Sequence, residues 1–67
     1  MSVAKVIEIN ASSAKGIEDA VQHGLHKAAE SINKIKGAWV NEIKVVTADD
    51  GSVTEWRVNM KINFVVD

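Results

Sequence analysis

The fold is decided by residues 53–66, which read Val-Thr-Glu-Trp-Arg-Val-Asn-Met-Lys-Ile-Asn-Phe-Val-Val. Between residues 55 and 64 apolar and polar residues alternate with a period of two, which is typical of a strand with one buried face. The apolar positions are Trp56, Val58, Met60, Ile62 and Phe64, followed by Val66, and the polar positions are Glu55, Arg57, Asn59, Lys61 and Asn63. The polar face is unusually rich in hydrogen-bond donors, so it can line an interface between copies or an internal cavity.

The preceding residues predict a partner for this strand. Residues 38–48 form a second predicted strand, and the sequence Asp49-Asp50-Gly51-Ser52 separates the two. An Asp-Gly step between apolar segments is a strong signal for a hairpin turn. Residues 3–10 are rich in β-branched side chains and predict a third strand, which ends at the turn-like composition of residues 11–13.

Between the first strand and the hairpin, the sequence predicts one amphipathic helix. Its apolar residues recur at spacings of three, four and seven, which place them on one face. They are Ile17, Ala20, Val21, Gly24, Leu25, Ala28, Ile32 and Ile35. Gly16 is the expected N-cap and Gly37 the expected stop. The order strand, helix, hairpin predicts an α+β fold in which a three-stranded antiparallel sheet covers one helix (β-α-β-β), as a single domain over residues 1–67.

Composition sets limits on stability and partners. The chain has 67 residues, 46% of them hydrophobic and 25% charged, with no cysteine and two histidines. A domain this small buries little surface, and without disulfides the expected source of stability is self-association. The net charge of −1 disfavours nucleic acid as a partner. No apolar run approaches the length of a membrane span, and a cytoplasmic location is expected.

The sequence offers no catalytic machinery. It has no cysteine nucleophile, no Gly-rich phosphate loop and no Gly-x-Ser-x-Gly motif. Ser12 and Ser13 are interpreted as turn residues leading into the helix. His23 and His26 lie three residues apart and could place two imidazoles beside a metal, but a solvated surface or a subunit contact is the favoured interpretation. The Asp49-Asp50 pair is interpreted as a hairpin turn rather than a cation site, so metal ligands are left unassigned.

Two tryptophans carry most of the aromatic surface. Trp56 lies at an apolar position of its strand and is expected in the core. An even hairpin loop would set Trp39 opposite Ile62, on the helix-covered side, and this core position is the favoured one. A single β-bulge in residues 38–48 would instead turn Trp39 to the polar face near Arg57, where it could stack on a ligand.

Three stretches spread over the chain form a common pattern. They are Lys5-Val6-Ile7-Glu8-Ile9, Ser12-Ser13 followed by Gly16-Ile17-Glu18-Asp19-Ala20-Val21, and Arg57-Val58-Asn59-Met60-Lys61-Ile62-Asn63-Phe64. Through these stretches the whole chain resembles the dodecin family. It implies a hollow dodecamer of cubic symmetry in which each subunit wraps its sheet around one helix. Dodecins are not enzymes. They store or sequester riboflavin or FMN by stacking it on a tryptophan near the start of the second strand, and some also hold coenzyme A.

The sequence departs from the flavin-binding pattern at two positions. The position of the flavin tryptophan falls on Gly37, with Trp39 two residues later, and the position of a ring-binding glutamine falls on Arg57. Both departures resemble the calcium dodecin branch of the family. Arginine donates hydrogen bonds but cannot accept one, unlike glutamine.

Three functions follow as expectations. The first is a non-enzymatic dodecamer that binds flavin through Trp39, Arg57, Gly37 and Asn59, with Trp39 as the stacking platform and Arg57 as the polar anchor. The second is a cage of the same architecture that binds calcium or another small ligand. The third is a structural module whose polar strand face only mediates assembly.

Overall fold

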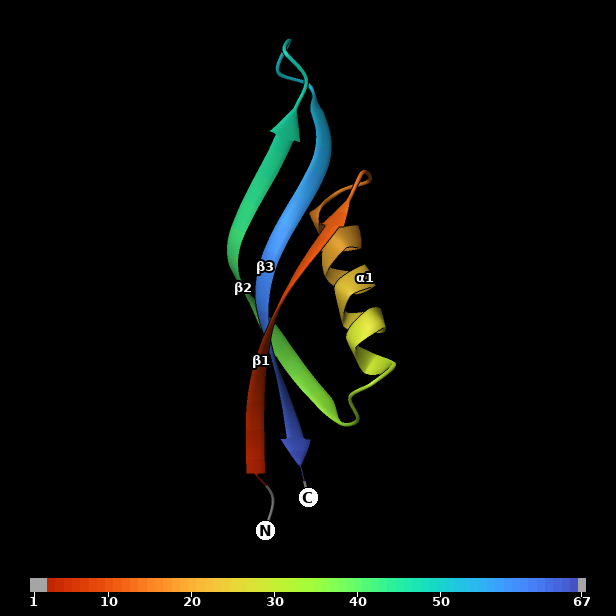
Figure 1. Ribbon diagram of the computed structural model, residues 1–67, viewed down its shortest axis with the longest axis vertical. Helices are drawn as coiled ribbons and strands as arrows, with labels where there is room; N and C mark the ends of the chain where they lie inside the picture. Colours follow the sequence, from red (N-terminus) through yellow and green to blue (C-terminus); the bar gives the residue numbers. More distant parts are fainter. Residues whose placement is uncertain (1–2, 67) are drawn as a thin grey trace.

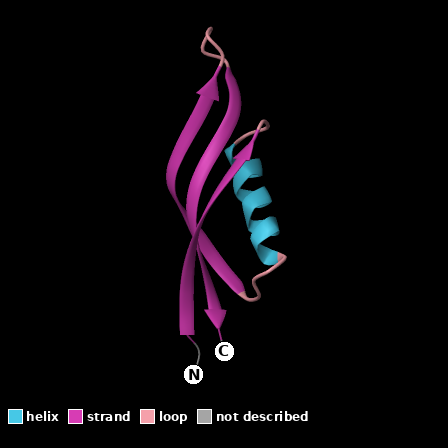
Figure 2. Cartoon of the chain, in the orientation of Figure 1, coloured by secondary structure: helices cyan, strands magenta, loops and turns pink. Residues whose placement is uncertain are grey.

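The computed structural model describes residues 3–66 and contains one helix and one sheet (Figure 1). The elements are β1 (Val3–Ser13), α1 (Ile17–Ala29), β2 (Ile35–Thr47) and β3 (Val53–Val66). The strands form one antiparallel sheet in the order β1-β3-β2, so β3 is the central strand. The β2–β3 hairpin extends well beyond the helix (Figure 2). The predicted α+β fold with β-α-β-β order is confirmed.

The core forms where α1 packs on β1 and β3. The buried apolar side chains of β3 are Val58, Met60 and Ile62, three of the alternating positions predicted from the sequence, and Ala20 joins them from α1. Trp56, which was expected in the core, is only half-buried. Gly24 is also buried and faces the sheet. A Cβ atom on Gly24 would lie 2.6 Å from Met60 Cε and 2.9 Å from Ala11 Cβ. The absence of a side chain at residue 24 therefore lets the helix approach the sheet closely.

A valine at Gly24 is expected to destabilise the protein by about 1–3 kcal/mol, the usual cost of overpacking a close-packed core. Met60 can move its terminal methyl group, but Ala11 Cβ moves only with the backbone of β1. The measurement is the free energy of unfolding by denaturant at a fixed protomer concentration. Ala29→Val is the matched control, because Ala29 lies exposed on the last turn of the same helix. Equal stability of the two variants would contradict the close approach.

The helix is shorter than predicted. It ends at Ala29, so Ile32 and Ile35 do not extend its apolar face, and Gly37 lies in β2 instead of terminating the helix. Lys34, the residue just before β2, has a left-handed φ of 62°. Ile35 then pairs with Phe64 at the start of β2. Strand pairing with β3 therefore overrides the helical periodicity of these residues.

The first strand is longer than predicted. The expected turn at residues 11–13 is wrong, because these residues continue β1 and Ser13 pairs with Trp56 on β3. The side chain of Ser13 still organises the start of the helix. Its hydroxyl donates to Asp19 Oδ2 over 2.6 Å and accepts from the Lys15 N–H over 2.9 Å. Backbone pairing with the long strand β3 thus outweighs the local turn preference of serine.

The hairpin turn is as predicted. Gly51 adopts a φ of 88°, which is left-handed and suits glycine. Asp50 Oδ1 accepts hydrogen bonds from the Ser52 hydroxyl at 2.7 Å and the Ser52 N–H at 2.9 Å. These bonds lower the pKa of Asp50, with the hydroxyl bond the larger cause. Asp50 therefore belongs to the turn at the tip of the hairpin.

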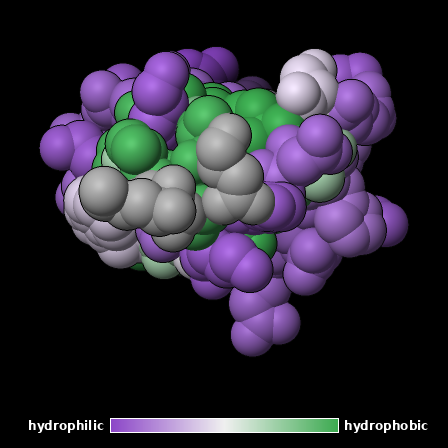
Figure 3. Space-filling view, turned by 90° about the horizontal axis from the view of Figure 1, so that it is seen from below, coloured by the Kyte–Doolittle hydropathy of each residue, from purple (hydrophilic) through white to green (hydrophobic). Residues whose placement is uncertain are grey.

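Several apolar side chains remain outside the core. Val40, Ile43 and Val45 of β2 lie opposite Met60, Val58 and Trp56, and so share the helix-side face of the sheet. They are 39%, 53% and 40% exposed, because α1 packs mainly over β1 and β3. We call these three residues the β2 stripe. A further apolar area, which includes Val3 and Val66, lies at the end of the molecule where the described chain begins and ends (Figure 3).

Candidate functional site

The face of the sheet opposite the helix, here called the open face, contains every residue that the sequence assigned to ligand binding. Its side chains are arranged in cross-strand rungs, each made of the residues paired across β1, β3 and β2 in that order. The rungs are Val6–Asn63–Gly37, Glu8–Lys61–Trp39, Asn10–Asn59–Glu42 and Ser12–Arg57–Lys44. Successive rungs are about 7 Å apart along the strands.

Trp39 lies on the open face, so the favoured core position is wrong. It pairs with Lys61 instead of Ile62. The cause is a β-bulge between Val40 and Glu42 that leaves Asn41 as an extra residue and shifts the register by one. The alternative of a bulge that turns Trp39 to the polar face is confirmed, although its cross-strand neighbour is Lys61 instead of Arg57.

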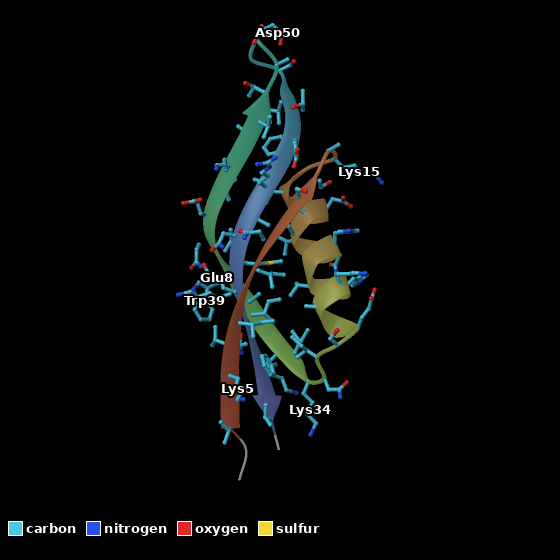
Figure 4. All side chains as sticks on the ribbon, viewed as in Figure 1. Lys5, Glu8, Lys15, Lys34, Trp39 and Asp50 are labelled. Carbon is cyan, nitrogen blue, oxygen red and sulfur yellow. The ribbon has the colours of Figure 1, made fainter. Side chains whose placement is uncertain are left out.

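The indole ring of Trp39 is available to a planar ligand. The residue is 49% exposed, and it projects with Glu8 from the side of the sheet away from α1 (Figure 4). The Lys61 Nζ atom lies 6.0 Å from the centroid of the ring, within the range of a cation–π contact. Trp56, by contrast, faces the helix side and is half-buried.

Gly37 lies on the open face one rung before Trp39. Residues two apart in a strand share a face, so Trp39 projects from the same face of β2 as residue 37, where the family pattern places its tryptophan. A Cβ atom on Gly37 would meet only Asn63 Oδ1, at 3.3 Å. Gly37 therefore places no side chain on the open face next to the rung of Trp39.

Arg57 is two rungs from Trp39, in the direction of the hairpin. Its Nε donates to Glu55 Oε1 over 3.0 Å. This bond is the largest cause of the lowered pKa of Glu55. The guanidinium is therefore held at the hairpin side of the open face by an acidic neighbour.

Asn59 lies on the rung between those of Trp39 and Arg57. It belongs to a ladder of hydrogen-bonded side-chain amides that crosses all three strands. Asn41 Nδ2 donates to Asn59 Oδ1 over 2.9 Å, and Asn59 Nδ2 donates to Asn10 Oδ1 over 3.0 Å. The sequence analysis missed Asn10 and Asn41. Asn41 is the bulge residue, whose side chain a regular register would place on the other face, and Asn10 appeared only as the last residue of a strand.

A groove of about 840 Å³ runs over this part of the molecule. On the open face it is lined by Asn10, Ser12, Glu42, Lys44, Arg57 and Asn59. It continues past β1 to His23 and Lys27 of the helix. Trp39 is not in its lining but lies one rung beyond Asn59. The open face therefore combines the polar side of this groove with an exposed indole one rung beyond it.

No group of side chains suited to binding a metal ion is found among the described residues. His23 and His26 are both exposed on α1. Among residues 3–66 no three His, Cys, Asp or Glu side chains gather in a group that could hold a metal ion. The same residues include no helix long and apolar enough to cross a membrane.

These features define a small α+β protein in which one helix covers one face of an antiparallel sheet and the opposite face is left open, polar and partly aromatic. The chain belongs to the dodecin family, because the family model described as Dodecin matches residues 3–67. A comparison with curated protein sequences finds no significant relative.

Solved structures of dodecins have the same fold. A variant of the Thermus thermophilus dodecin aligns with a TM-score of 0.91 at 27% identity, covering 100% of this chain and 98% of that one. The dodecin from Streptomyces davaonensis aligns with a TM-score of 0.90 at 26% identity, covering 98% and 96%. The calcium dodecin of Mycobacterium tuberculosis, described as a calcium-chelating antigen, aligns with a TM-score of 0.81 at 26% identity, covering 97% and 91%. The resemblance to the family, including its calcium branch, is confirmed.

Proposed function

We propose that this protein is a non-enzymatic homododecamer that binds riboflavin or FMN and so stores or sequesters it. The observation that carries the proposal is the position of Trp39, which is half exposed on the open face and has no side chain next to it at Gly37. An exposed indole is a good platform for the flat ring of a flavin, because offset stacking adds to the burial of apolar area. Stacking also quenches excited flavin, which suits a storage role.

The polar residues of the open face support the same ligand. Asn59 and Arg57 lie one and two rungs from Trp39 and can donate hydrogen bonds to ring carbonyls or to a phosphate. The groove beside them can accept a polar substituent such as a ribityl chain. Coenzyme A, which resembles FMN in carrying a phosphate, is a further ligand for the same groove.

Assembly is supported by apolar surface that the single chain leaves uncovered. The β2 stripe and the residues Val3 and Val66 are each at least 39% exposed. A domain of this size gains little stability from its own core, so burial of these side chains against other copies would supply the rest.

A calcium-binding cage is the second candidate function. One observation favours it, the similarity to the Mycobacterium tuberculosis calcium dodecin. The oxygen atoms of Glu8 and Glu42 on neighbouring rungs are of the kind that calcium prefers. The described residues of one chain do not complete such a site, so the ligands would come from several copies.

The test is a titration of oxidised riboflavin and FMN into apo protein, with flavin and tryptophan fluorescence followed together and the particle mass measured by light scattering. Mutual quenching in a particle of twelve subunits is the expected result. An intact particle without quenching would exclude the flavin function. Thermal unfolding with calcium and with a chelator then tests the second candidate, since a bound ion raises the unfolding temperature.

A further inference from the structure

The amide ladder Asn10–Asn59–Asn41 has hydrogen-bonding capacity that the protein does not use. A carboxamide offers two hydrogens and two acceptor lone pairs. The ladder uses one lone pair of Asn10, one hydrogen of Asn41, and one of each from Asn59. Every amide of the ladder therefore keeps a free hydrogen or lone pair, and Asn10 and Asn59 also line the groove of the open face.

The ladder lies where a ring stacked on Trp39 can reach it. Asn59 is on the rung next to that of Lys61 and Trp39, a separation of about 7 Å along the strand. The isoalloxazine ring of a flavin is a fused system of three rings, longer than this separation. Its pyrimidine end carries an imide, in which the N3–H lies between two carbonyl groups. A carboxamide complements this edge, because its oxygen accepts the N–H and its nitrogen donates to the carbonyl beside it.

Other side chains of the open face match an imide less well. Lys61 and Arg57 only donate hydrogen bonds, and Glu42 only accepts them. Arg57 is also two rungs away and donates to Glu55. Asn63 has the right chemistry, but it lies on the Gly37 side of the Trp39 rung and outside the lining of the groove.

Building on the flavin-binding function proposed above, we propose that Asn59 and Asn41 of the amide ladder recognise the imide edge of the flavin, so that the ladder, and not Arg57, is the polar anchor of the stacked ring. Asn10 positions Asn59 by accepting its hydrogen bond. The proposal therefore limits the ligand to a narrower class than flat aromatic rings in general. It is a planar heterocycle with an N–H between two carbonyl groups.

The experiment compares riboflavin with 3-methylriboflavin, in which a methyl group replaces the imide hydrogen. Dissociation constants are measured by fluorescence quenching for the wild type, Asn59→Ala, Asn41→Ala and Asn63→Ala. Asn33→Ala is a control outside the open face. Light scattering and thermal unfolding report whether each variant assembles. Asn41 is exposed on an outer strand, so its variant keeps the test valid if Asn59→Ala fails to fold.

The wild type is expected to bind riboflavin roughly tenfold more tightly than the methylated ring, the effect of losing one well-placed hydrogen bond. Asn59→Ala and Asn41→Ala should abolish this preference while quenching by Trp39 persists. Asn63→Ala and Asn33→Ala should keep it. The inference is overturned if both ladder variants keep the preference, if Asn63→Ala alone loses it, or if the wild type binds both rings equally. Equal binding of the two rings would leave the proposed flavin function intact. If the protein bound neither ring, both the flavin function and the role of the amide ladder would be excluded.

Discussion

The Trp39→Ala protein is expected to bind flavin roughly 10- to 100-fold more weakly than the wild type, because stacking of one base-like ring on an aromatic side chain contributes about 1–3 kcal/mol. Most of the mutual fluorescence quenching should disappear with it. Trp39 is half exposed, opposite Lys61 and away from the core, so its removal leaves the buried residues of β3 in contact. The measurement is a riboflavin titration at a fixed protomer concentration.

Two matched variants show whether the loss of flavin affinity comes from removal of the stacking ring. Trp39→Phe keeps a flat ring at the same position and should retain most of the affinity. Trp56→Phe changes the other tryptophan, which faces the helix side, and should leave flavin quenching unchanged. If Trp39→Ala bound flavin as tightly as the parent, or if Trp56→Phe alone abolished quenching, Trp39 would not be the stacking platform.

The Ile43→Asp protein is expected to fail to form the full-size particle. Ile43 is the most exposed member of the β2 stripe, at 53%, and lies on the helix side of the sheet beyond the cover of α1. If copies of the chain bury this surface, a carboxylate there would have to leave water without a partner, at a cost of several kcal/mol per copy. The cost recurs in every subunit, so the particle mass should collapse to small species.

Light scattering and thermal unfolding measure this effect together. The unfolding temperature should fall strongly, because a domain of this size is marginally stable alone. Gln22→Asp introduces the same charge on the exposed side of α1 and should assemble normally. A full-size Ile43→Asp particle would show that the β2 stripe is not an assembly surface.

The periodicity of residues 53–66 was sufficient to predict the buried centre of β3 and the two faces of this strand. Met60 and Ile62 are fully buried at alternating positions, and Arg57 and Asn59 share the face away from the helix. This succeeds because β3 is the central strand, paired on both sides and packed under a helix, while the register shifts fall in β2. The start of the helix and the Asp-Gly turn were also predicted, because both depend on residues close in sequence.

The candidate site was predicted less completely, since it depends on features that are not local. Gly37, Trp39, Asn59 and Arg57 do share one face, but Trp39 reaches it only through the bulge at Asn41. Nothing in residues 38–48 marks that bulge, because an extra residue is tolerated wherever the two strands can still pair on either side of it. The amide ladder depends on the same bulge and on pairing with β1, which is 49 residues distant at Asn10 and Asn59.

The sequence by itself therefore determined the fold family, the buried and polar faces of residues 53–66, and four of the residues available for a ligand, namely Gly37, Trp39, Arg57 and Asn59. The tertiary structure alone decided where the helix ends, how far β1 extends, and which face Trp39 and Asn41 occupy. The physical reason is that alternation along one strand is a local property of the chain. Register between strands, by contrast, is settled by the sum of backbone hydrogen bonds and packing across the whole sheet.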